Sequence, residues 1–100
     1  MKITKIASRL KDYAEIRTNF PDADFWVVRR GTQEAVGKPV KEFSPEHIGI
    51  KVSSDDLLPN YLYYALMNAH MSGVFQGIAH GTTDLVNIRA QDIENISLGG

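Results

Sequence analysis

The sequence predicts a single α/β domain of the α+β kind, in which a small mixed sheet packs against helices. Three observations lead to this expectation. The chain has 100 residues and 43% of them are apolar, which suits one domain with one modest core. Several short segments are rich in aromatic and β-branched residues, as strands are. Residues 59–69 instead repeat apolar side chains at the spacing of a helix.

The N-terminal segment shows a helical repeat. Its apolar side chains recur at intervals of three and four: Ile3, Ile6, Ala7, Leu10, Tyr13 and Ala14. This spacing predicts an amphipathic helix over residues 2–15, with a break near Leu10. Thr18, Asn19 and Pro21 then favour a turn, because the residue before a proline prefers extended geometry.

Residues 25–30 (FWVVRR) predict a buried, central strand, because they are aromatic and β-branched and are followed by a glycine. Successive side chains of a strand point to opposite faces of the sheet. Trp26 and Val28 are therefore expected on one face. Phe25 and Val27 are expected on the other.

The next segment predicts a hairpin and a second strand. Glycines at both ends of residues 31–37 favour a hairpin or tight loop, with the chain returning through residues 39–43. Residues 44–47 (SPEH) place serine before proline, which is typical of the first turn of a helix. Residues 48–52 (IGIKV) alternate apolar residues with small or charged ones and predict a strand.

A helix is predicted over residues 59–69. Asp55 and Asp56 bring negative charge to its start, and Pro59 suits its first turn. Its apolar face consists of Tyr61, Leu62, Ala65, Leu66 and Ala69. A second helix is predicted over residues 72–79, although its two glycines each cost about 1 kcal/mol relative to alanine.

The C-terminal part predicts two short strands, residues 85–88 and 96–98, after a turn at Gly81-Thr82-Thr83. Asp92 is expected to cap a turn of helix between these strands. The expected sheet contains residues 25–30, 48–52, 85–88 and 96–98. The threonine hydroxyls of the turn are expected to satisfy nearby backbone groups, and binding of an oxyanion is the alternative.

Composition and motifs argue against a catalytic or metal-binding protein. The net charge is −1 and there is no cysteine, so a disulfide scaffold, a thiolate zinc site and a cysteine nucleophile are excluded. No two of the histidines His47, His70 and His80 lie four residues apart. A phosphate loop and a serine-nucleophile motif are also missing. We therefore expect a non-catalytic chain without metal or cofactor.

The sequence lacks signals for membrane insertion or export. It has no run of roughly 18 apolar residues, the length that a membrane-spanning helix needs. Its first ten residues (MKITKIASRL) are charged and amphipathic, without the uninterrupted apolar stretch of a signal peptide. We therefore expect a cytoplasmic protein that makes no membrane contact.

Three segments resemble one protein family in their order. Residues 10–18 (LKDYAEIRT) come first, and residues 61–66 (YLYYAL) lie in the predicted helix. Residues 81–98 (GTTDLVNIRAQDIENISL) follow after the second helix. This order resembles the target-recognition domain of specificity subunits from type I restriction-modification enzymes. The resemblance implies a strand and turn at residues 10–18, followed usually by glycine where this chain has Asn19.

The resemblance implies a non-catalytic specificity module. Such a module presents loops to the major groove of double-stranded DNA and positions a partner methyltransferase or restriction subunit. Family members continue past the last strand into a proline-containing segment and a long spacer helix, and they carry long insertions for base recognition. Because this chain ends at Gly99-Gly100 and lacks such insertions, we expect a minimal version with one domain over residues 1–100.

The residues expected to contact DNA surround the predicted hairpin: Arg29, Arg30, Gln33, Lys38 and Lys41. Arginine and lysine donate to phosphates and guanine edges, and glutamine pairs with adenine. Glu34, Glu42 and Glu46 reduce the positive charge of this segment. Because neighbouring residues of a strand point to opposite faces, only one of the two arginines is expected to face a given partner.

A second set of candidate residues lies on the predicted helix and is expected to bind a partner: Tyr61, Tyr63, Tyr64 and Met67. Aromatic and methionine side chains stack on bases or form protein–protein surfaces. This helix and the near-neutral charge support an alternative function. In this alternative, the chain is a small accessory module of the mobile-element or phage type that binds a larger enzyme or forms a homo-oligomer.

Overall fold

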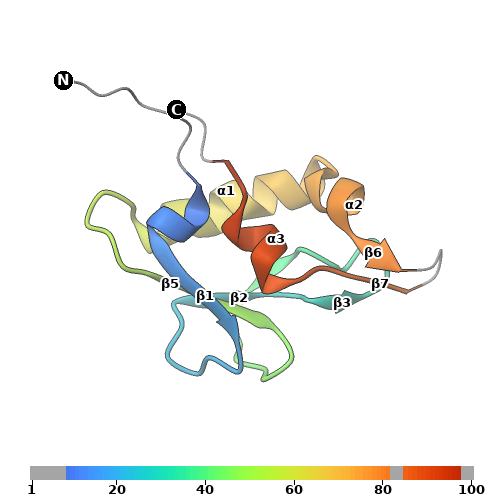
Figure 1. Ribbon diagram of the computed structural model, residues 1–100, viewed down its shortest axis with the longest axis horizontal. Coiled ribbons are helices and arrows are strands. Elements are labelled where there is room, and N and C mark those ends of the chain that lie inside the picture. Colours follow the sequence, from blue (N-terminus) through green and yellow to red (C-terminus); the bar gives the residue numbers. More distant parts are fainter. Residues whose placement is uncertain (1–8, 82–84, 98–100) are drawn as a thin grey trace.

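The computed structural model describes residues 9–81 and 85–97, which form two antiparallel sheets and a layer of helices (Figure 1). The first sheet has the order β1-β5-β2-β4 and contains β1 (Ala14–Thr18), β2 (Phe25–Val27), β4 (Pro39–Val40) and β5 (Ile48–Val52). The second has the order β3-β7-β6 and contains β3 (Arg30–Gly31), β6 (His80–Gly81) and β7 (Val86–Asn87). The predicted α+β class is confirmed, but the strands are divided between two sheets instead of forming one mixed sheet.

The helices are a short 3-10 helix, η1 (Leu10–Asp12), and the α-helices α1 (Pro59–Met71), α2 (Val74–Ile78) and α3 (Ala90–Glu94). Figure 1 shows them gathered along one side of the strands. Their buried side chains meet those of the first sheet in one core, which includes Leu10, Leu62, Leu66 and Ile93 from the helices and Phe25, Val27, Ile48 and Ile50 from the strands. Burial of this apolar area is the main force that stabilises the fold.

The predicted N-terminal helix is wrong from residue 13 onward. Helix η1 ends at Asp12, and the next residues form β1, which pairs antiparallel with the whole of β5. Ala14 and Ile16 are buried and the residues that follow each of them are exposed, so this segment has the alternation of a strand. A strand here is what the family resemblance implies. Residues 2–8 of the predicted helix lie outside the described residues.

The predicted strand over residues 25–30 is interrupted. Strand β2 ends at Val27. The backbone N–H of the next residue, Val28, still donates to the carbonyl oxygen of Lys38 at 3.0 Å, so the two sides of the hairpin stay paired there. Strand β3 then pairs with β7 in the other sheet. The chain therefore passes from the first sheet to the second shortly after Val28. Strand β4 forms the predicted return of the hairpin but ends at Val40, before residue 43.

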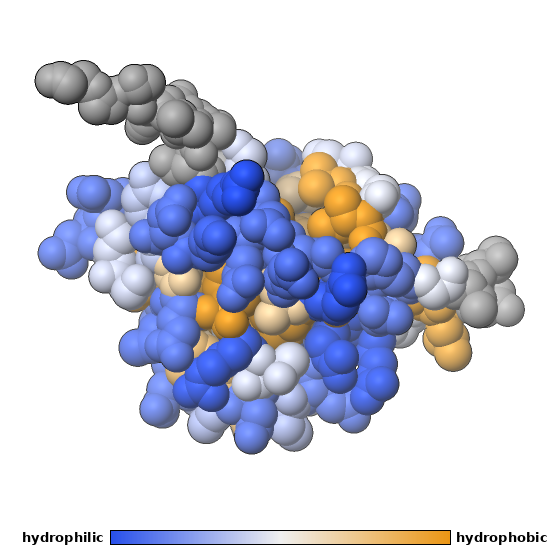
Figure 2. Space-filling model, viewed as in Figure 1, coloured by the Kyte–Doolittle hydropathy of each residue, from blue (hydrophilic) through white to orange (hydrophobic). Residues whose placement is uncertain are grey.

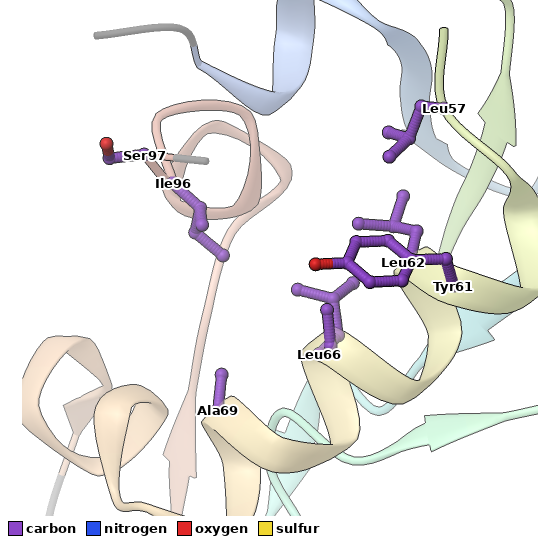
Figure 3. A pocket seen from close by; sticks show the side chains of 8 residues that line it. Leu57, Tyr61, Leu62, Leu66, Ala69, Ile96 and Ser97 are labelled. Carbon is purple, nitrogen blue, oxygen red and sulfur yellow. The ribbon is translucent and has the colours of Figure 1, made fainter. Parts of the chain in front are cut away.

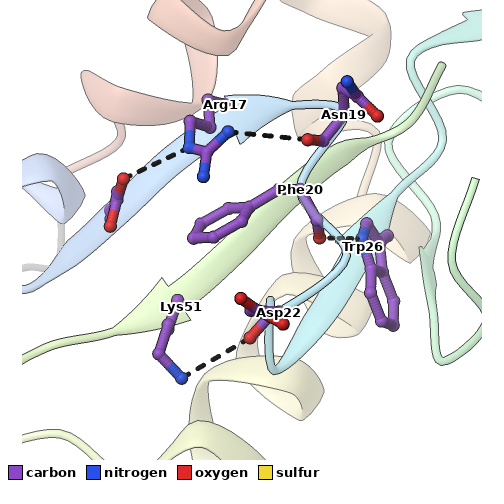
Figure 4. Close-up of polar contacts among 7 residues, drawn as sticks. Arg17, Asn19, Phe20, Asp22, Trp26 and Lys51 are labelled. Atoms are coloured by element: carbon purple, nitrogen blue, oxygen red, sulfur yellow. Dashed lines mark hydrogen bonds and ion pairs between the residues drawn. The ribbon is translucent and has the colours of Figure 1, made fainter. Parts of the chain in front are cut away.

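Both faces of β2 are covered by apolar side chains. Phe25 and Val27 lie in the main core, as the alternation predicts. The Trp26 indole Nε1 instead donates to the carbonyl oxygen of Phe20 at 2.9 Å, in the loop between β1 and β2 (Figure 4). The Arg17 guanidinium carbon lies 4.0 Å from the centroid of the Phe20 ring. This loop therefore closes a second, smaller apolar layer.

Asn19 occupies the position where the resembled family usually has glycine, and its backbone is left-handed with φ of 51°. Asparagine tolerates this conformation better than most residues, and glycine tolerates it best. We expect Asn19→Ala to lower the free energy of unfolding by about 1 kcal/mol, whereas Asn19→Gly changes it by less than about 0.5 kcal/mol. Urea denaturation measures both, and equal losses for the two variants would contradict this account.

Strand β5 has the predicted bounds, whereas residues 44–47 form a hydrogen-bonded turn instead of a helical turn. In this turn the N–H of His47 donates to the carbonyl oxygen of Ser44 at 3.1 Å. Close packing explains why β5 contains a glycine, Gly49. A Cβ atom at Gly49 would lie 2.6 Å from the Cβ of Phe20, so glycine allows the loop between β1 and β2 to approach the sheet.

Helix α1 is confirmed and extends two residues beyond the predicted end. Pro59 is its first residue, where a backbone N–H is not needed. Asp55 and Asp56 lie in a turn before the helix and not in its first turn. Gly73, with φ of 85°, separates α1 from α2. Helix α2 is therefore shorter than the predicted residues 72–79.

The region around the Gly-Thr-Thr turn contains one strand that the sequence did not predict. Strand β7 lies within the predicted residues 85–88 and pairs with β3 and β6. Strand β6 has no apolar side chain that marks it as a strand. Thr82 and Thr83 lie outside the described residues, so the structural role of their hydroxyls stays a prediction.

The last two elements differ from the prediction in detail. Asp92 is the third residue of α3 and caps the helix from within, because its Oδ2 accepts the backbone N–H of Arg89 at 2.8 Å. A strand over residues 96–98 does not form among the described residues. Ser97 makes an isolated antiparallel bridge with Arg9, and residue 98 is outside the described range.

Candidate interaction surfaces

The two arginines of the candidate DNA-binding set meet at one residue. The Nε of Arg29 donates to the backbone carbonyl oxygen of Glu46 at 2.8 Å, and the Nε of Arg30 lies 3.2 Å from the Glu46 Oε1. The two side chains thus approach the same residue, and the expectation that only one arginine faces a given partner stays a prediction. Strand β2 ends at Val27 and β3 begins at Arg30, so the two arginines do not lie in one continuous strand whose alternation would separate them.

The other three candidate residues of the hairpin are exposed: Gln33, Lys38 and Lys41. Gln33 lies in the turn that follows β3, and Lys38 lies just before β4. The Nζ of Lys41 is 4.7 Å from the centroid of the Tyr63 ring on α1, a cation–π contact. This contact joins the basic hairpin to the aromatic helix.

The charge of this surface is modest. Glu34, Glu42 and Glu46 are exposed beside the four cations, and of these carboxylates Glu46 is ion-paired to Arg30 with both side chains more than half exposed. An exposed pair of this kind adds little stability. A guanidinium group has five N–H donors, so an arginine whose Nε holds Glu46 keeps others with which to approach a phosphate or a base.

The four candidate partner-binding residues divide into an outward and an inward pair. Tyr61 and Tyr64 are 67% and 65% exposed. Tyr63 is half-buried, with its ring edge-on to Phe25 at 5.4 Å between centroids and its hydroxyl donating to the Pro39 carbonyl oxygen at 3.4 Å. Met67 is also half-buried. The outward pair therefore remains available to a partner, and the inward pair supports the helix.

The segment that contains α1 and α2, residues 57–81, has no aspartate, glutamate, lysine or arginine. Of the seven large apolar side chains exposed among the described residues, five lie in this segment: Leu58, Tyr61, Tyr64, Met71 and Val74. Figure 2 shows apolar residues gathered at the surface around α2. Aromatic residues and methionine without charge are typical of the centre of a protein–protein interface.

A groove lies between α1 and the segment that follows α3 (Figure 3). Its volume is about 260 Å³, and it is lined by Leu57, Tyr61, Leu62, Ala65, Leu66, Ala69, Ile96 and Ser97. A second hollow of about 440 Å³ shares Ala69, Ile96 and Ser97 with it and continues toward α2. The walls of the groove are mainly apolar, so this site suits the binding of an apolar group.

A polar cluster that the sequence did not predict forms where β6 meets α3. The Nε2 of His80 lies 3.3 Å from the Asp92 Oδ2 and 3.1 Å from a terminal nitrogen of Arg89. The pairing of β6 with β7 brings His80 to this position. The Arg-x-x-Asp spacing is visible in the sequence, but the approach of His80 is not. Because Asp92 also caps α3, we assign the cluster a structural role.

Among residues 9–81 and 85–97, no three histidine, aspartate or glutamate side chains are grouped so that they could hold a metal ion. Helices long and apolar enough to cross a membrane are likewise missing from this part of the chain. In comparisons with known proteins, no family model, curated protein or solved structure matches the chain.

Proposed function

We propose that this chain is a non-catalytic, cytoplasmic DNA-contacting module that resembles the target-recognition domain of type I restriction-modification specificity subunits. In this proposal the hairpin approaches double-stranded DNA, and a partner methyltransferase or nuclease supplies the chemistry. One observation carries it. Arg29 and Arg30 converge on Glu46 at the edge of an exposed hairpin that also holds Gln33, Lys38 and Lys41.

The hairpin presents its cations from a fixed support. Residues that read bases commonly lie on loops held by a rigid scaffold. Here the hairpin is held by the pairing of β2 with β4 and by the pairing of β3 with β7. The contacts with Glu46 restrict both arginine side chains before any ligand is bound, which lowers the conformational entropy that binding would remove.

Two further features support the resemblance. Strand β1 and the turn after it lie where the resemblance implies a strand and turn. The backbone of Asn19 is left-handed, a conformation that glycine adopts most easily, and the resembled family usually has glycine at this position.

A double substitution tests the proposal. Arg30→Ala with Lys38→Ala is expected to weaken binding to a mixed-sequence duplex. The negative slope of log K against log salt should also become shallower by up to about two, because each phosphate contact that is lost decreases the magnitude of the slope by about one. Both positions are exposed, so folding should be preserved. Fluorescence anisotropy over a salt series measures both quantities.

The matched control removes the same charges elsewhere. Arg9 precedes η1 and Lys11 lies within it; both are exposed, and both are distant from the hairpin in the sequence. Arg9→Ala with Lys11→Ala is expected to leave the salt slope nearly unchanged. Equal decreases of affinity in the two double variants would mean that binding depends on overall charge and not on the hairpin.

A second candidate function is a protein-interaction module that binds a larger enzyme or oligomerises. The exposed tyrosines of α1, in a segment without charged residues of its own, favour it. This module would show negligible duplex affinity with or without the hairpin substitutions. Tyr64→Ala would weaken its partner complex, because exposed aromatic anchors often dominate interfaces. Tyr64 suits this test better than Tyr63, whose ring also packs on Phe25.

A further inference from the structure

One exposed ion pair of the hairpin places hydrogen-bond donors beside an acceptor. The Nε of Arg30 donates to the Glu46 Oε1 at 3.2 Å, and the two side chains are 57% and 61% exposed. A guanidinium group also has two terminal nitrogens that carry N–H donors, and an ionised carboxylate has a second oxygen that accepts. The pair therefore offers a ligand two donor nitrogens and, next to them, one acceptor oxygen.

Two different elements hold this pair in place. Arg30 belongs to β3, which pairs with β7. Glu46 lies in the turn before β5, where the His47 N–H donates to the carbonyl oxygen of Ser44 at 3.1 Å. The Arg29 Nε donates to the carbonyl oxygen of Glu46 at 2.8 Å and so ties this turn to the hairpin. Groups that are ordered before binding lose less conformational entropy when a ligand arrives.

The major-groove edge of a G·C base pair presents the complementary pattern. Guanine offers two neighbouring acceptors, N7 and O6, and cytosine offers its N4 amino group as a donor beside them. In an A·T pair the amino group of adenine lies between the acceptors N7 and O4. Two donors followed by one acceptor therefore match a G·C pair and do not match an A·T pair.

We propose that Arg30 and Glu46 together read a G·C base pair in the major groove. In this arrangement the terminal nitrogens of Arg30 donate to guanine N7 and O6, and the second carboxylate oxygen of Glu46 accepts a hydrogen bond from the cytosine N4 amino group. The inference rests on the proposed contact with DNA, and it adds which base pair the hairpin selects.

The charge of the pair points to a base edge and not to the phosphate backbone. Glu46 offsets the charge of Arg30, and a carboxylate beside a phosphate is repelled by it. At a base edge the same carboxylate meets amino groups from which it can accept. Contacts with phosphates are then left mainly to Lys38 and Lys41, which are also exposed.

Modified duplexes test which atoms of the base pair are read. Fluorescence anisotropy compares three alternating duplexes of equal length. The first contains G·C pairs, the second replaces guanine with 7-deazaguanine, which lacks N7, and the third replaces guanine with inosine, which lacks only the minor-groove amino group. For the wild-type chain, 7-deazaguanine is expected to weaken binding at least about fivefold, and inosine is expected to change it less than about twofold.

Arg30→Lys separates the geometry of the side chain from its charge. Lysine keeps the positive charge but has no planar fork of donors. This variant is therefore expected to bind the G·C duplex and the 7-deazaguanine duplex equally tightly. Its slope of log K against log salt should equal that of the wild-type chain, because no charge is lost. Circular dichroism checks that the fold is retained.

Glu46→Ala and Glu42→Ala form a matched pair of variants. Both glutamates are exposed, and each substitution removes one negative charge. Of the two, Glu46 is the one that is paired with Arg30. Glu46→Ala is expected to bind the G·C duplex at least about fivefold more weakly than Glu42→Ala, because it loses both the acceptor for cytosine and the support of Arg30.

Four results would overturn the inference and leave DNA contact intact. The first is equal binding of the wild-type chain to the G·C and 7-deazaguanine duplexes. The second is an effect of 7-deazaguanine that persists in folded Arg30→Lys, and the third is equal affinity of the two glutamate variants. The fourth is a large loss on inosine, which would place the contact in the minor groove. A folded wild-type chain that binds none of the three duplexes would contradict the proposed function as well.

Discussion

Replacing Gly37 with alanine is expected to lower the free energy of unfolding by about 2 to 5 kcal/mol. Gly37 has φ of 91°, a left-handed backbone that other residues adopt with strain. A Cβ atom at this position would also overlap the buried ring of Phe75 from α2. Both the strain and the overlap act where the hairpin packs against α2.

Chemical denaturation measures this destabilisation, and a second glycine supplies the control. A Cβ atom at Gly77, inside α2, would have no neighbour within 4 Å. Gly77→Ala is therefore expected to be neutral or to stabilise the chain by up to about 1 kcal/mol through helix propensity. If both alanine variants unfolded at the same denaturant concentration, the close approach of Phe75 to the hairpin would be wrong.

Leu66→Ala is expected to destabilise the chain by about 2 to 5 kcal/mol. Leu66 is 2% exposed and belongs to the main core, where it also forms part of the groove wall. Truncation removes buried apolar area and leaves a cavity, because the surrounding helices and strands relax only in part. For a single domain of this size the decrease approaches the whole stability.

The matched control is another large apolar residue of the same helix. Met71 is 77% exposed on the outward side of α1. Met71→Ala is expected to change the stability of the chain by less than about 0.5 kcal/mol. A melting temperature of Leu66→Ala that equals the wild-type value would show that the buried side of α1 has been assigned incorrectly.

The sequence predicts best the elements that are decided locally. The apolar repeat at residues 59–69 continues over several turns and starts at a proline, and it becomes α1 with almost the predicted bounds. The β-branched alternation at residues 48–52 becomes β5. In both elements the local periodicity indicates the correct type, although β5 also pairs with the distant strands β1 and β2.

Elements that depend on distant pairing are predicted less well. Leu10, Tyr13 and Ala14 fit a helical repeat, but Ala14 and Ile16 also fit a strand, and pairing with β5, much later in the sequence, decides between them. The passage of the chain from β2 to β3 likewise requires β7, which lies far along the sequence. Local propensity contains no information about such partners.

The candidate sites show the same division. The residue types of the hairpin are visible in the sequence, but the convergence of Arg29 and Arg30 on Glu46 is not, because it follows from the interruption after β2. The outward position of Tyr64 and the inward position of Tyr63 require the orientation of α1. The absence of charge over residues 57–81 is visible in the sequence, but the exposure of Tyr61 and Tyr64 is not.

Binding of the wild-type chain to a mixed-sequence duplex as a function of salt tests the proposed function most directly. We predict measurable affinity at low salt and a linear fall of log K with log salt. The slope should be no steeper than about −4, because the hairpin offers Arg29, Arg30, Lys38 and Lys41 as its cations. A chain that is folded but does not bind duplex even at the lowest salt would contradict DNA contact by this domain.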